Sequence, residues 1–236
     1  MWLSEDMDIR VVAFDIFGTT VDWYTGVADQ VTSLLPEVDA GDFAQRWRDR
    51  YIPSMDRVRG GERDWTYLDT LHRESLDDLL RELDVKADDE TRDRLVLAWH
   101  RLPAWPDSVS GLARIRSKHT TAALSNGGFA LLTRLAKSAA LPFDCILSAE
   151  LAHTYKPDPA VYRTAAALLD VAPEQVLMVA AHKWDLDGAR AAGLRTAFVE
   201  RPREKGPNRA ADRAADVECD LHADSFLDLA TQLDSP

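Results

Sequence analysis

Side chains capable of chemistry follow four short apolar runs of this sequence, at the points where the runs end. The runs are 11–14, 120–124, 145–147 and 176–179. The side chains that follow them are Asp15, Ser125, Asn126, Lys156, His182 and Asp185. Because the carboxyl ends of parallel strands meet at one edge of a sheet, residues this far apart in the chain can converge. Any one of these strand ends is weak evidence, but four in succession indicate a functional site at that edge.

Asp15 is the strongest candidate for a functional residue. It ends a run with β-branched residues, which is typical of a strand buried on both faces. Gly18 follows closely and takes the backbone out of the sheet, so free N–H groups should gather near the carboxylate and attract an anion. A cation such as Lys156 within ~4–6 Å would lower the pKa of Asp15 and keep it charged. The alternative is that Asp15 only caps a turn, as Asp often does.

Apolar runs alternate with helical patterns over most of the chain. A fifth strand is predicted at 196–199, and helices are predicted at 131–135, 159–169, 189–192 and 226–233. This alternation predicts a parallel sheet with right-handed crossovers, which is a Rossmann-like α/β core. The segment 201–208 is predicted to be a charged surface loop.

A helical segment interrupts the alternation after the first strand. Between about residues 26 and 100, apolar residues recur three and four positions apart, as in Leu76, Leu79 and Leu83. Such spacing predicts amphipathic helices. We therefore predict a catalytic core made of residues 1–24 and 103–236, with an inserted α-helical cap domain at 25–102.

Composition narrows the range of partners. The chain has 236 residues and a formal net charge of −12, which argues against nucleic acid and anionic membrane as partners. Its two cysteines, Cys145 and Cys219, lack metal-binding spacing. Residues 1–8 lack the pattern of a secretory signal, and no run reaches the ~18 apolar residues of a membrane span. We expect a soluble cytoplasmic protein.

The order of the motifs resembles the haloacid dehalogenase superfamily. The motifs are Asp-x-Phe-Gly-Thr at 15–19, Ser-Asn-Gly at 125–127, Lys-Pro-Asp-Pro at 156–159, and Trp-Asp at 184–185 ahead of Gly-Ala-Arg-Ala-Ala-Gly at 188–193. The resemblance covers nearly the whole chain and places the helical segment where that superfamily inserts its cap. It implies that Asp15 is the nucleophile, and that Ser125 and Lys156 bind the substrate anion and the nucleophile's carboxylate.

Most members of that superfamily are magnesium-dependent phosphatases, which carry a second Asp two residues after the nucleophile and a Gly-Asp pair at the fourth strand. Here the first position is Phe17, and the fourth motif reads Val-Ala-Ala-His at 179–182. Because Mg²⁺ prefers oxygen ligands, two lost carboxylates disfavour a metal site, and we expect no metal ion or other cofactor. A magnesium-dependent phosphatase and a non-catalytic small-anion-binding relative remain the alternatives.

Phe17 and the Trp-Asp pair resemble instead the L-2-haloacid dehalogenases (type II). This resemblance implies hydrolysis of short (S)-2-haloalkanoic acids, such as chloroacetate, through an ester on Asp15. Arg48 would receive the halide, Asn126 and Trp184 would complete the halide cradle, and Phe17 would wall the pocket. The alternative for Arg48 is a solvated arginine on a charged helix. Cleavage of the C–F bond of fluoroacetate is left open.

The resemblance places two more residues near the substrate. Tyr162 matches a family tyrosine beside the substrate, although an amphipathic helix residue with a solvated hydroxyl explains it equally well. Thr19 is expected to fix the loop that presents Asp15. The implied partners are a 2-haloacid and water, and the family suggests a homodimer.

Hydrolysis of the ester requires an activated water, and Asp185 is the best candidate to orient or deprotonate it. The family usually has Ser and Asn where this chain has Ala180 and His182. His182 could replace the missing Asn as a donor, or act as the base with Asp185 orienting it, because an unperturbed imidazole titrates near pH ~6.5. Otherwise His182 is a loop histidine that is hydrogen-bonded to the backbone.

Overall fold

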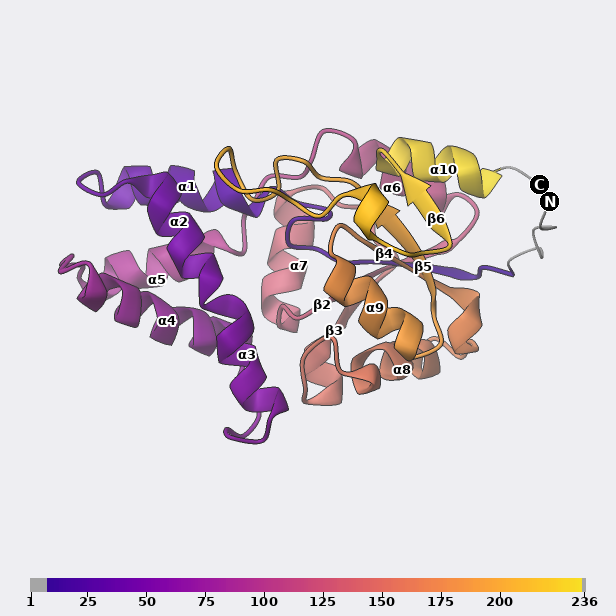
Figure 1. The fold of residues 1–236 in the computed structure, drawn as a ribbon, viewed down its shortest axis with the longest axis horizontal. Coiled ribbons are helices and arrows are strands. Elements are labelled where there is room, and N and C mark those ends of the chain that lie inside the picture. Colours follow the sequence, from indigo (N-terminus) through magenta and orange to yellow (C-terminus); the bar gives the residue numbers. More distant parts are fainter. Residues whose placement is uncertain (1–7, 235–236) are drawn as a thin grey trace.

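A six-stranded parallel sheet forms the centre of the core, as seen in the computed structural model, which describes residues 8–234 (Figure 1). The strands lie in the order β3-β2-β1-β4-β5-β6. Their bounds are β1 Val11–Phe14, β2 Thr120–Ser125, β3 Cys145–Ser148, β4 Val176–Ala180, β5 Arg195–Val199 and β6 Leu221–Ala223. The predicted α/β fold is confirmed.

Strand β1 lies in the middle of the sheet, between β2 and β4. Val11 is in register with Thr120 on one side and with Val176 on the other. All four residues of β1 are buried, as expected of a parallel strand that is covered on both faces. Asp15 therefore leaves the sheet at the centre of its carboxyl edge, where the strand order changes direction and α/β proteins bind their ligands.

Helices cover both faces of the sheet (Figure 1). Over one face, α6 (Ser108–Arg116) packs against α10 (Phe226–Asp234). Over the other lie α8 (Pro159–Leu168) and α9 (Lys183–Ala191), and α7 (Phe129–Ser138) connects β2 to β3. The turn at the carboxyl edge is thus supported by a rigid three-layer core.

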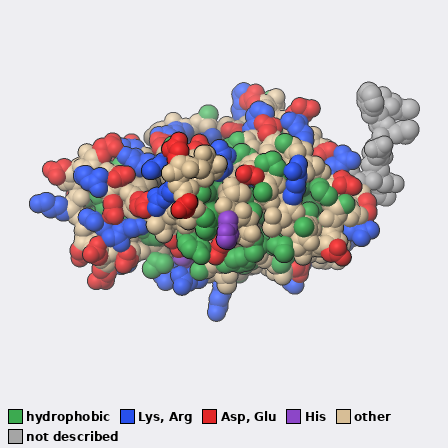
Figure 2. Space-filling model, turned by 90° about the horizontal axis from the view of Figure 1, so that it is seen from below, with side chains coloured by type: hydrophobic (Ala, Val, Ile, Leu, Met, Phe, Trp, Pro, Cys, Tyr) green, Lys and Arg blue, Asp and Glu red, His purple; other side chains and the backbone are tan. Residues whose placement is uncertain are grey.

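Five helices form a separate layer at one end of the molecule, on the left of Figure 1. Their bounds are α1 Trp23–Leu34, α2 Ala40–Asp49, α3 Tyr51–Arg59, α4 Leu68–Glu82 and α5 Asp89–Ala98. Asp22, Asp39 and Asp88 each accept a backbone N–H at a helix start, which stabilises α1, α2 and α5. Figure 2 shows acidic and basic side chains interspersed over this end, as expected of solvated faces of amphipathic helices.

The predicted helical insertion corresponds to this layer. The limits given for the domains, 1–24 and 103–236 for the core and 25–102 for the cap, stay a prediction. Residues 1–7, on which the expected lack of a secretory signal mostly rests, lie outside the described residues, as do 235–236. Within residues 8–234, every helix is too short or too polar to cross a bilayer.

Three parts of the core differ from the sequence-based prediction. Helix α6 and strand β6 were not predicted, and β6 has three residues, of which only Ala223 is buried, so no periodic pattern could mark it. The prediction that residues 201–208 form a surface loop is wrong for two charged residues, which are buried. These are Arg201 and Glu204, and they pair with Asp107 and His182, respectively.

Replacing Phe226 with Ala should lower the free energy of unfolding by about 3–5 kcal/mol. The Phe226 side chain is fully buried, and its ring centroid lies 4.9 Å from that of Phe14 on β1. Urea unfolding measures this loss. As a control, Leu227→Ala changes the neighbouring, 41% exposed residue and should cost less than about 1 kcal/mol. Equal losses in the two variants would contradict the packing described here.

Candidate active site

The turn after β1 holds the carboxylate of Asp15 at the carboxyl edge of the sheet. The Asp15 N–H donates to Val179 O at 2.9 Å, and Thr20 Oγ1 donates to the Asp15 carbonyl oxygen at 2.6 Å. Thr19 Oγ1 donates to Asp15 Oδ2 at 2.8 Å and accepts a hydrogen bond from the Ala181 N–H at 2.9 Å. Thr19 thus ties the loop after β1 to the loop after β4 and orients the carboxylate.

One buried ammonium group joins two carboxylates. Lys156 Nζ lies 3.2 Å from Asp15 Oδ1 and 2.7 Å from Asp185 Oδ2. Burial opposes the charge on Asp15, but Lys156 and His182 outweigh it and hold the pKa of Asp15 well below its usual range. Burial likewise opposes the charge on Lys156, whose pKa the two carboxylates nevertheless raise. Asp15 is therefore ionised and Lys156 protonated at neutral pH.

Asp185 is fully buried and is held by two side-chain donors. Lys156 contacts Oδ2, and the Tyr162 hydroxyl donates to Oδ1 at 2.6 Å. Burial raises the pKa of Asp185; Lys156 lowers it in part, and the charge on Asp15 raises it again, so the net direction is upward. Tyr162 thus positions Asp185, and it is not one of the residues that line the cavity described below.

His182, just before α9, lies between two carboxylates. Its Nδ1 is 3.2 Å from Asp15 Oδ2, at ion-pair distance but outside hydrogen-bond geometry, and its Nε2 is 3.1 Å from Glu204 Oε1. Burial lowers the pKa of His182, but Glu204 and Asp15 outweigh it and raise the pKa to about 10. The suggestion that Asp185 orients His182 is therefore wrong, because the carboxylate at Nε2 belongs to Glu204.

Glu204 comes from the loop that follows β5, and it is 2% exposed. Its Oε1 also accepts a hydrogen bond from Trp23 Nε1 at 2.8 Å. Burial raises the pKa of Glu204, but His182 outweighs burial and lowers the pKa to about 2. Gly18 leaves the space for this side chain: it has φ of +89°, and a Cβ there would lie 2.5 Å from Glu204 Cγ.

The guanidinium group of Arg48, on α2, lies in a cage of aromatic rings. Its Cζ is 3.9 Å from the ring centroid of Tyr51, 5.3 Å from that of Trp23, and 5.9 Å from those of Phe17 and Trp99. Aromatic faces stabilise a cation by their quadrupole. The Nη1 atom of Arg48 is buried and has no hydrogen-bond partner within residues 8–234. One charged donor is therefore available to an anion.

Strand β2 delivers two further buried residues, Ser125 and Asn126. Ser125 Oγ accepts a hydrogen bond from the Gly127 N–H at 3.2 Å, and Asn126 Oδ1 accepts one from the Lys156 N–H at 2.7 Å. These bonds fix the Asn126 side chain beside the Lys156 backbone. Its Nδ2 is buried without a partner in the described part of the chain, so it is a second free donor.

A cavity of about 460 Å³ lies between the cap and the core. Its lining residues are Trp23, Gln45, Arg48, Asp49, Tyr51 and Ile52 from the cap, and His182, Trp184, Glu204, Lys205, Arg209, Ala210 and Asp212 from the core. Trp184 stacks on His182, with ring centroids 5.8 Å apart. The volume suits a small molecule, and His182 connects the cavity to Asp15.

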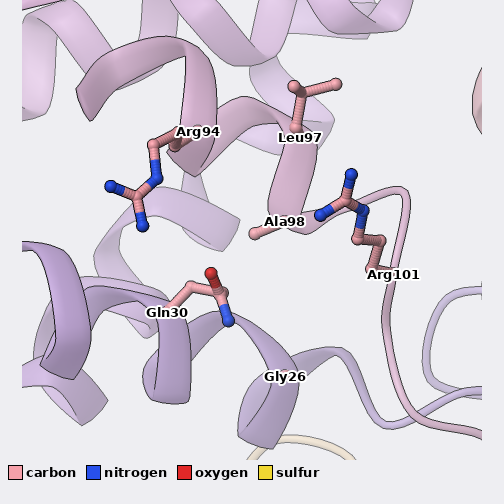
Figure 3. Close-up of a pocket in the computed structure, with 6 residues that line it drawn as sticks. All are labelled: Gly26, Gln30, Arg94, Leu97, Ala98 and Arg101. Carbon is pink, nitrogen blue, oxygen red and sulfur yellow. The ribbon is translucent and has the colours of Figure 1, made fainter. Parts of the chain in front are cut away.

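A second hollow, of about 240 Å³, lies between α1 and α5 (Figure 3). The guanidinium groups of Arg94 and Arg101 flank it, with Gln30 on the facing helix, and both arginines are exposed to solvent. It shares no lining residue with the cavity beside His182, and it holds no carboxylate or other nucleophile. We therefore place the candidate active site at the cap–core cavity.

The residues around Asp15 do not fit a magnesium ion. The ammonium group of Lys156 takes the position between Asp15 and Asp185, and Phe17 and Ala181 offer no side-chain oxygen. Among residues 8–234, no three His, Cys, Asp or Glu side chains are grouped so as to hold a metal.

The structure places most of the predicted site residues close together. Thr19, Lys156 and His182 contact Asp15. Lys156 also contacts Asp185, which in turn accepts a hydrogen bond from Tyr162. Arg48 and Trp184 line the cavity, whereas Phe17 packs behind Arg48.

Among the residues of the site that were not predicted, Trp23, Tyr51 and Glu204 contact its charged groups. Trp23 lies just after the first motif, and Tyr51 lies three residues after Arg48, at the start of α3, so their closeness in sequence to predicted residues was a usable signal. Glu204 lies in a segment without periodicity and had no comparable signal.

Comparisons with known proteins agree with this geometry. Residues 9–193 match the model of the haloacid dehalogenase-like hydrolase family. An (S)-2-haloacid dehalogenase of Pseudomonas sp. (strain CBS-3) is 33% identical over 198 residues, which cover 82% of this chain and 85% of that protein. The crystal structure of a defluorinating L-2-haloacid dehalogenase superposes with a TM-score of 0.93 at 45% identity, covering 96% of each chain.

A third relative was solved in a reacted state. It is the L-2-haloacid dehalogenase from Xanthobacter autotrophicus with chloropropionic acid covalently bound, 25% identical, with a TM-score of 0.83 over 95% of this chain and 98% of that one. The family match spans the first four strands and all the cap helices. The predicted family is confirmed: the chain belongs to the haloacid dehalogenase-like hydrolases.

Proposed function

We propose that the protein hydrolyses short (S)-2-haloalkanoic acids to 2-hydroxy acids through an ester on Asp15. One observation carries the proposal: Lys156 keeps a buried carboxylate ionised beside a small cavity whose wall holds an arginine with a free donor. Asp15 attacks C2 of the substrate, a C–O bond forms, and the carbon–halogen bond breaks with its electron pair on the halide. The covalent chloropropionate in the Xanthobacter relative supports this course.

The free donors suit a departing halide. Arg48 Nη1 and Asn126 Nδ2 are buried without partners among the described residues, and a buried donor without a partner favours an anion. The aromatic rings around Arg48 exclude water, which strengthens its attraction for the charge that develops on the leaving group. Fluoride accepts hydrogen bonds strongly, so we include fluoroacetate in the proposed range, which the defluorinating relative also supports.

The second half-reaction returns Asp15 to its starting state. Water attacks Cγ of the ester, Asp185 takes one of its protons, and the C–O bond to the product breaks so that the alkoxide receives this proton. The second water proton leaves the new carboxyl group for solvent, which restores the ionised Asp15. The raised pKa of Asp185 favours its action as a base, and Tyr162 fixes its position. Ser125 and Lys156 are proposed to bind the substrate's carboxylate, and Trp184 is proposed to line the halide side.

Two alternatives receive less support. A phosphatase of this fold would need a metal ion, which the residues around Asp15 do not fit. A non-catalytic anion-binding protein would have no need of an ionised carboxylate buried beside Lys156, since that charge repels anions. The expected cytoplasmic location and homodimer remain parts of the proposal, and size-exclusion chromatography with light scattering tests the dimer.

Asp15→Asn should reduce chloride release from chloroacetate by about 10⁴-fold or more, because the amide is not a nucleophile. Rapidly quenched wild-type enzyme should gain the mass of the propionate group from 2-chloropropionate, and the variant should not. Asp187→Asn, at a half-buried aspartate of α9 that pairs with Lys183, is the control and should leave the rate unchanged. A fully active Asp15→Asn variant would refute the proposal.

Arg48→Met should lower kcat by about 10²–10³-fold, the usual effect of removing one donor to a developing anion. Methionine fits an aromatic cage, so the cap should stay folded, which circular dichroism checks. Arg46→Met is the matched control, since Arg46 lies on the same helix and pairs with Glu82 instead. Similar rates for the Arg48 and Arg46 variants would exclude Arg48 from the halide site.

Halide release should be unchanged after dialysis against EDTA, because Lys156 supplies the cation between the two carboxylates. Ion chromatography of the released halide, with and without added Mg²⁺, measures this. Loss of activity with EDTA that Mg²⁺ restores, together with release of phosphate from phosphate esters, would favour the phosphatase instead.

A further inference from the structure

Glu204 is a buried carboxylate that the proposed chemistry does not use. It is 2% exposed, and it reaches the site from a loop that contributes none of the motifs of the family. Trp23 Nε1 donates to its Oε1, and His182 Nε2 lies 3.1 Å from the same oxygen. Gly18, in the loop that follows Asp15, leaves room for the Glu204 side chain because it has no Cβ. Burying a carboxylate costs free energy, which an opposite charge in contact with it must offset. For Glu204 that opposite charge is His182.

We propose that Glu204 is a positioning residue that keeps His182 as an imidazolium facing Asp15, and that His182 stabilises the oxyanion formed when water attacks the Asp15 ester. This inference rests on the proposed function, because it concerns the second half of that reaction.

The two contacts of His182 require both ring nitrogens to carry protons. Nε2 faces Glu204 Oε1 at 3.1 Å, and Nδ1 faces Asp15 Oδ2 at 3.2 Å. A neutral imidazole has a single N–H and would point a lone pair at one of the two carboxylates. The other charges near this pair are Lys156, which contacts the opposite oxygen of Asp15, and Arg48, which attracts Glu204 across the cavity.

Once the ester has formed on Asp15, the charge of His182 depends on Glu204. While Asp15 is ionised, two carboxylates hold the proton on His182, but alkylation of Asp15 removes its negative charge. Glu204 is then the remaining carboxylate in contact with the ring. Without it, burial would favour the neutral imidazole at the point where the positive charge is needed.

The oxygen that His182 faces is suited to carry the developing charge. Oδ2 already accepts a hydrogen bond from Thr19 at 2.8 Å, and the ring of His182 faces the same oxygen at ion-pair distance, so a donor and a positive charge both lie beside it. In the step, the alkyl group is on Oδ1, the water oxygen bonds to Cγ and the carbonyl electron pair moves to Oδ2, while one water proton passes to Asp185. The bond between Oδ1 and the product carbon then stays, and the Cγ–Oδ1 bond breaks. As it breaks, the electron pair on Oδ2 re-forms the carbonyl, the alkoxide takes the proton from Asp185, and the second water proton leaves the new carboxyl group for solvent.

This role replaces the suggestion that His182 is the base. A base needs a free lone pair, whereas the Nδ1 of an imidazolium has none to offer. The two roles predict opposite effects of pH in a variant that lacks the charge of Glu204. They can therefore be separated by experiment.

The test is the pH dependence of ester hydrolysis in Glu204→Gln, followed by rapid quenching and intact-mass analysis after reaction with 2-chloropropionate. Glutamine keeps an acceptor for Trp23 but carries no charge. Ester hydrolysis in the variant should slow by about tenfold for each pH unit above neutrality, or about 100-fold between pH 7 and 9. Burial then acts on the imidazole without an opposing carboxylate, so the pKa of His182 lies at or below its ordinary value and the protonated fraction falls about tenfold per pH unit. Wild-type hydrolysis should change little over this range.

The control is Glu200→Gln in the same loop, whose carboxylate accepts a hydrogen bond from the Ala214 N–H and does not contact His182. It should follow the wild-type profile. A Glu204→Gln variant that is slowed equally at every pH would show a merely structural role. One that becomes faster as pH rises would make His182 the base. Either result overturns the inference.

A second measurement does not depend on turnover. An NMR titration of the His182 ring in the free enzyme should give a pKa well above 6.5 for the wild type and a lower pKa for Glu204→Gln. An unchanged pKa would contradict the pairing. If no 2-haloacid alkylates Asp15 in the wild type, the proposed function fails, while the titration still decides whether Glu204 controls the charge of His182.

Discussion

The ammonium group of Lys156, buried between the carboxylates of Asp15 and Asp185, is the interaction on which the active site depends. Removing a charge from water costs several kcal/mol, and two buried carboxylates would also repel each other. Lys156 offsets both costs and keeps Asp15 ionised. Opposite charges are paired in the same way toward the cavity, because His182 faces Asp15 and Glu204 faces His182. Each buried charge is thus held by an opposite one, and the chain of pairs runs from the sheet to the cavity wall.

The sheet makes this arrangement rigid. Asp15 follows β1, His182 follows β4 and Glu204 follows β5, and β4 lies between the other two strands. Side chains placed at neighbouring strand ends keep their spacing because the strands are hydrogen-bonded in register. The cap supplies what the core lacks, namely Arg48 and the aromatic rings around it. The core holds the proposed nucleophile, and the cap presents the proposed donor to the halide.

The sequence predicted the fold class, the four strand ends and the cap because each has a local signal. Asp15 ends an apolar run, Lys156 lies in a recognisable motif, and the cap helices show regular apolar spacing. Glu204 could not be found in this way. It lies 181 residues from Trp23 and 22 from His182, in a charged loop that looks like solvated surface. Its importance comes from contacts that only the folded chain creates, and the charge state of His182 follows from those contacts.

The origin of the product's oxygen tests the central claim most directly. When excess enzyme completes a single turnover of chloroacetate in H₂¹⁸O, the hydroxyl oxygen of the product should come from Asp15 and be unlabelled. The peptide that contains Asp15 should gain one ¹⁸O, because water attacks Cγ of the ester. Label in the product and none in the peptide would mean that water attacks the substrate directly, which would contradict a nucleophilic Asp15.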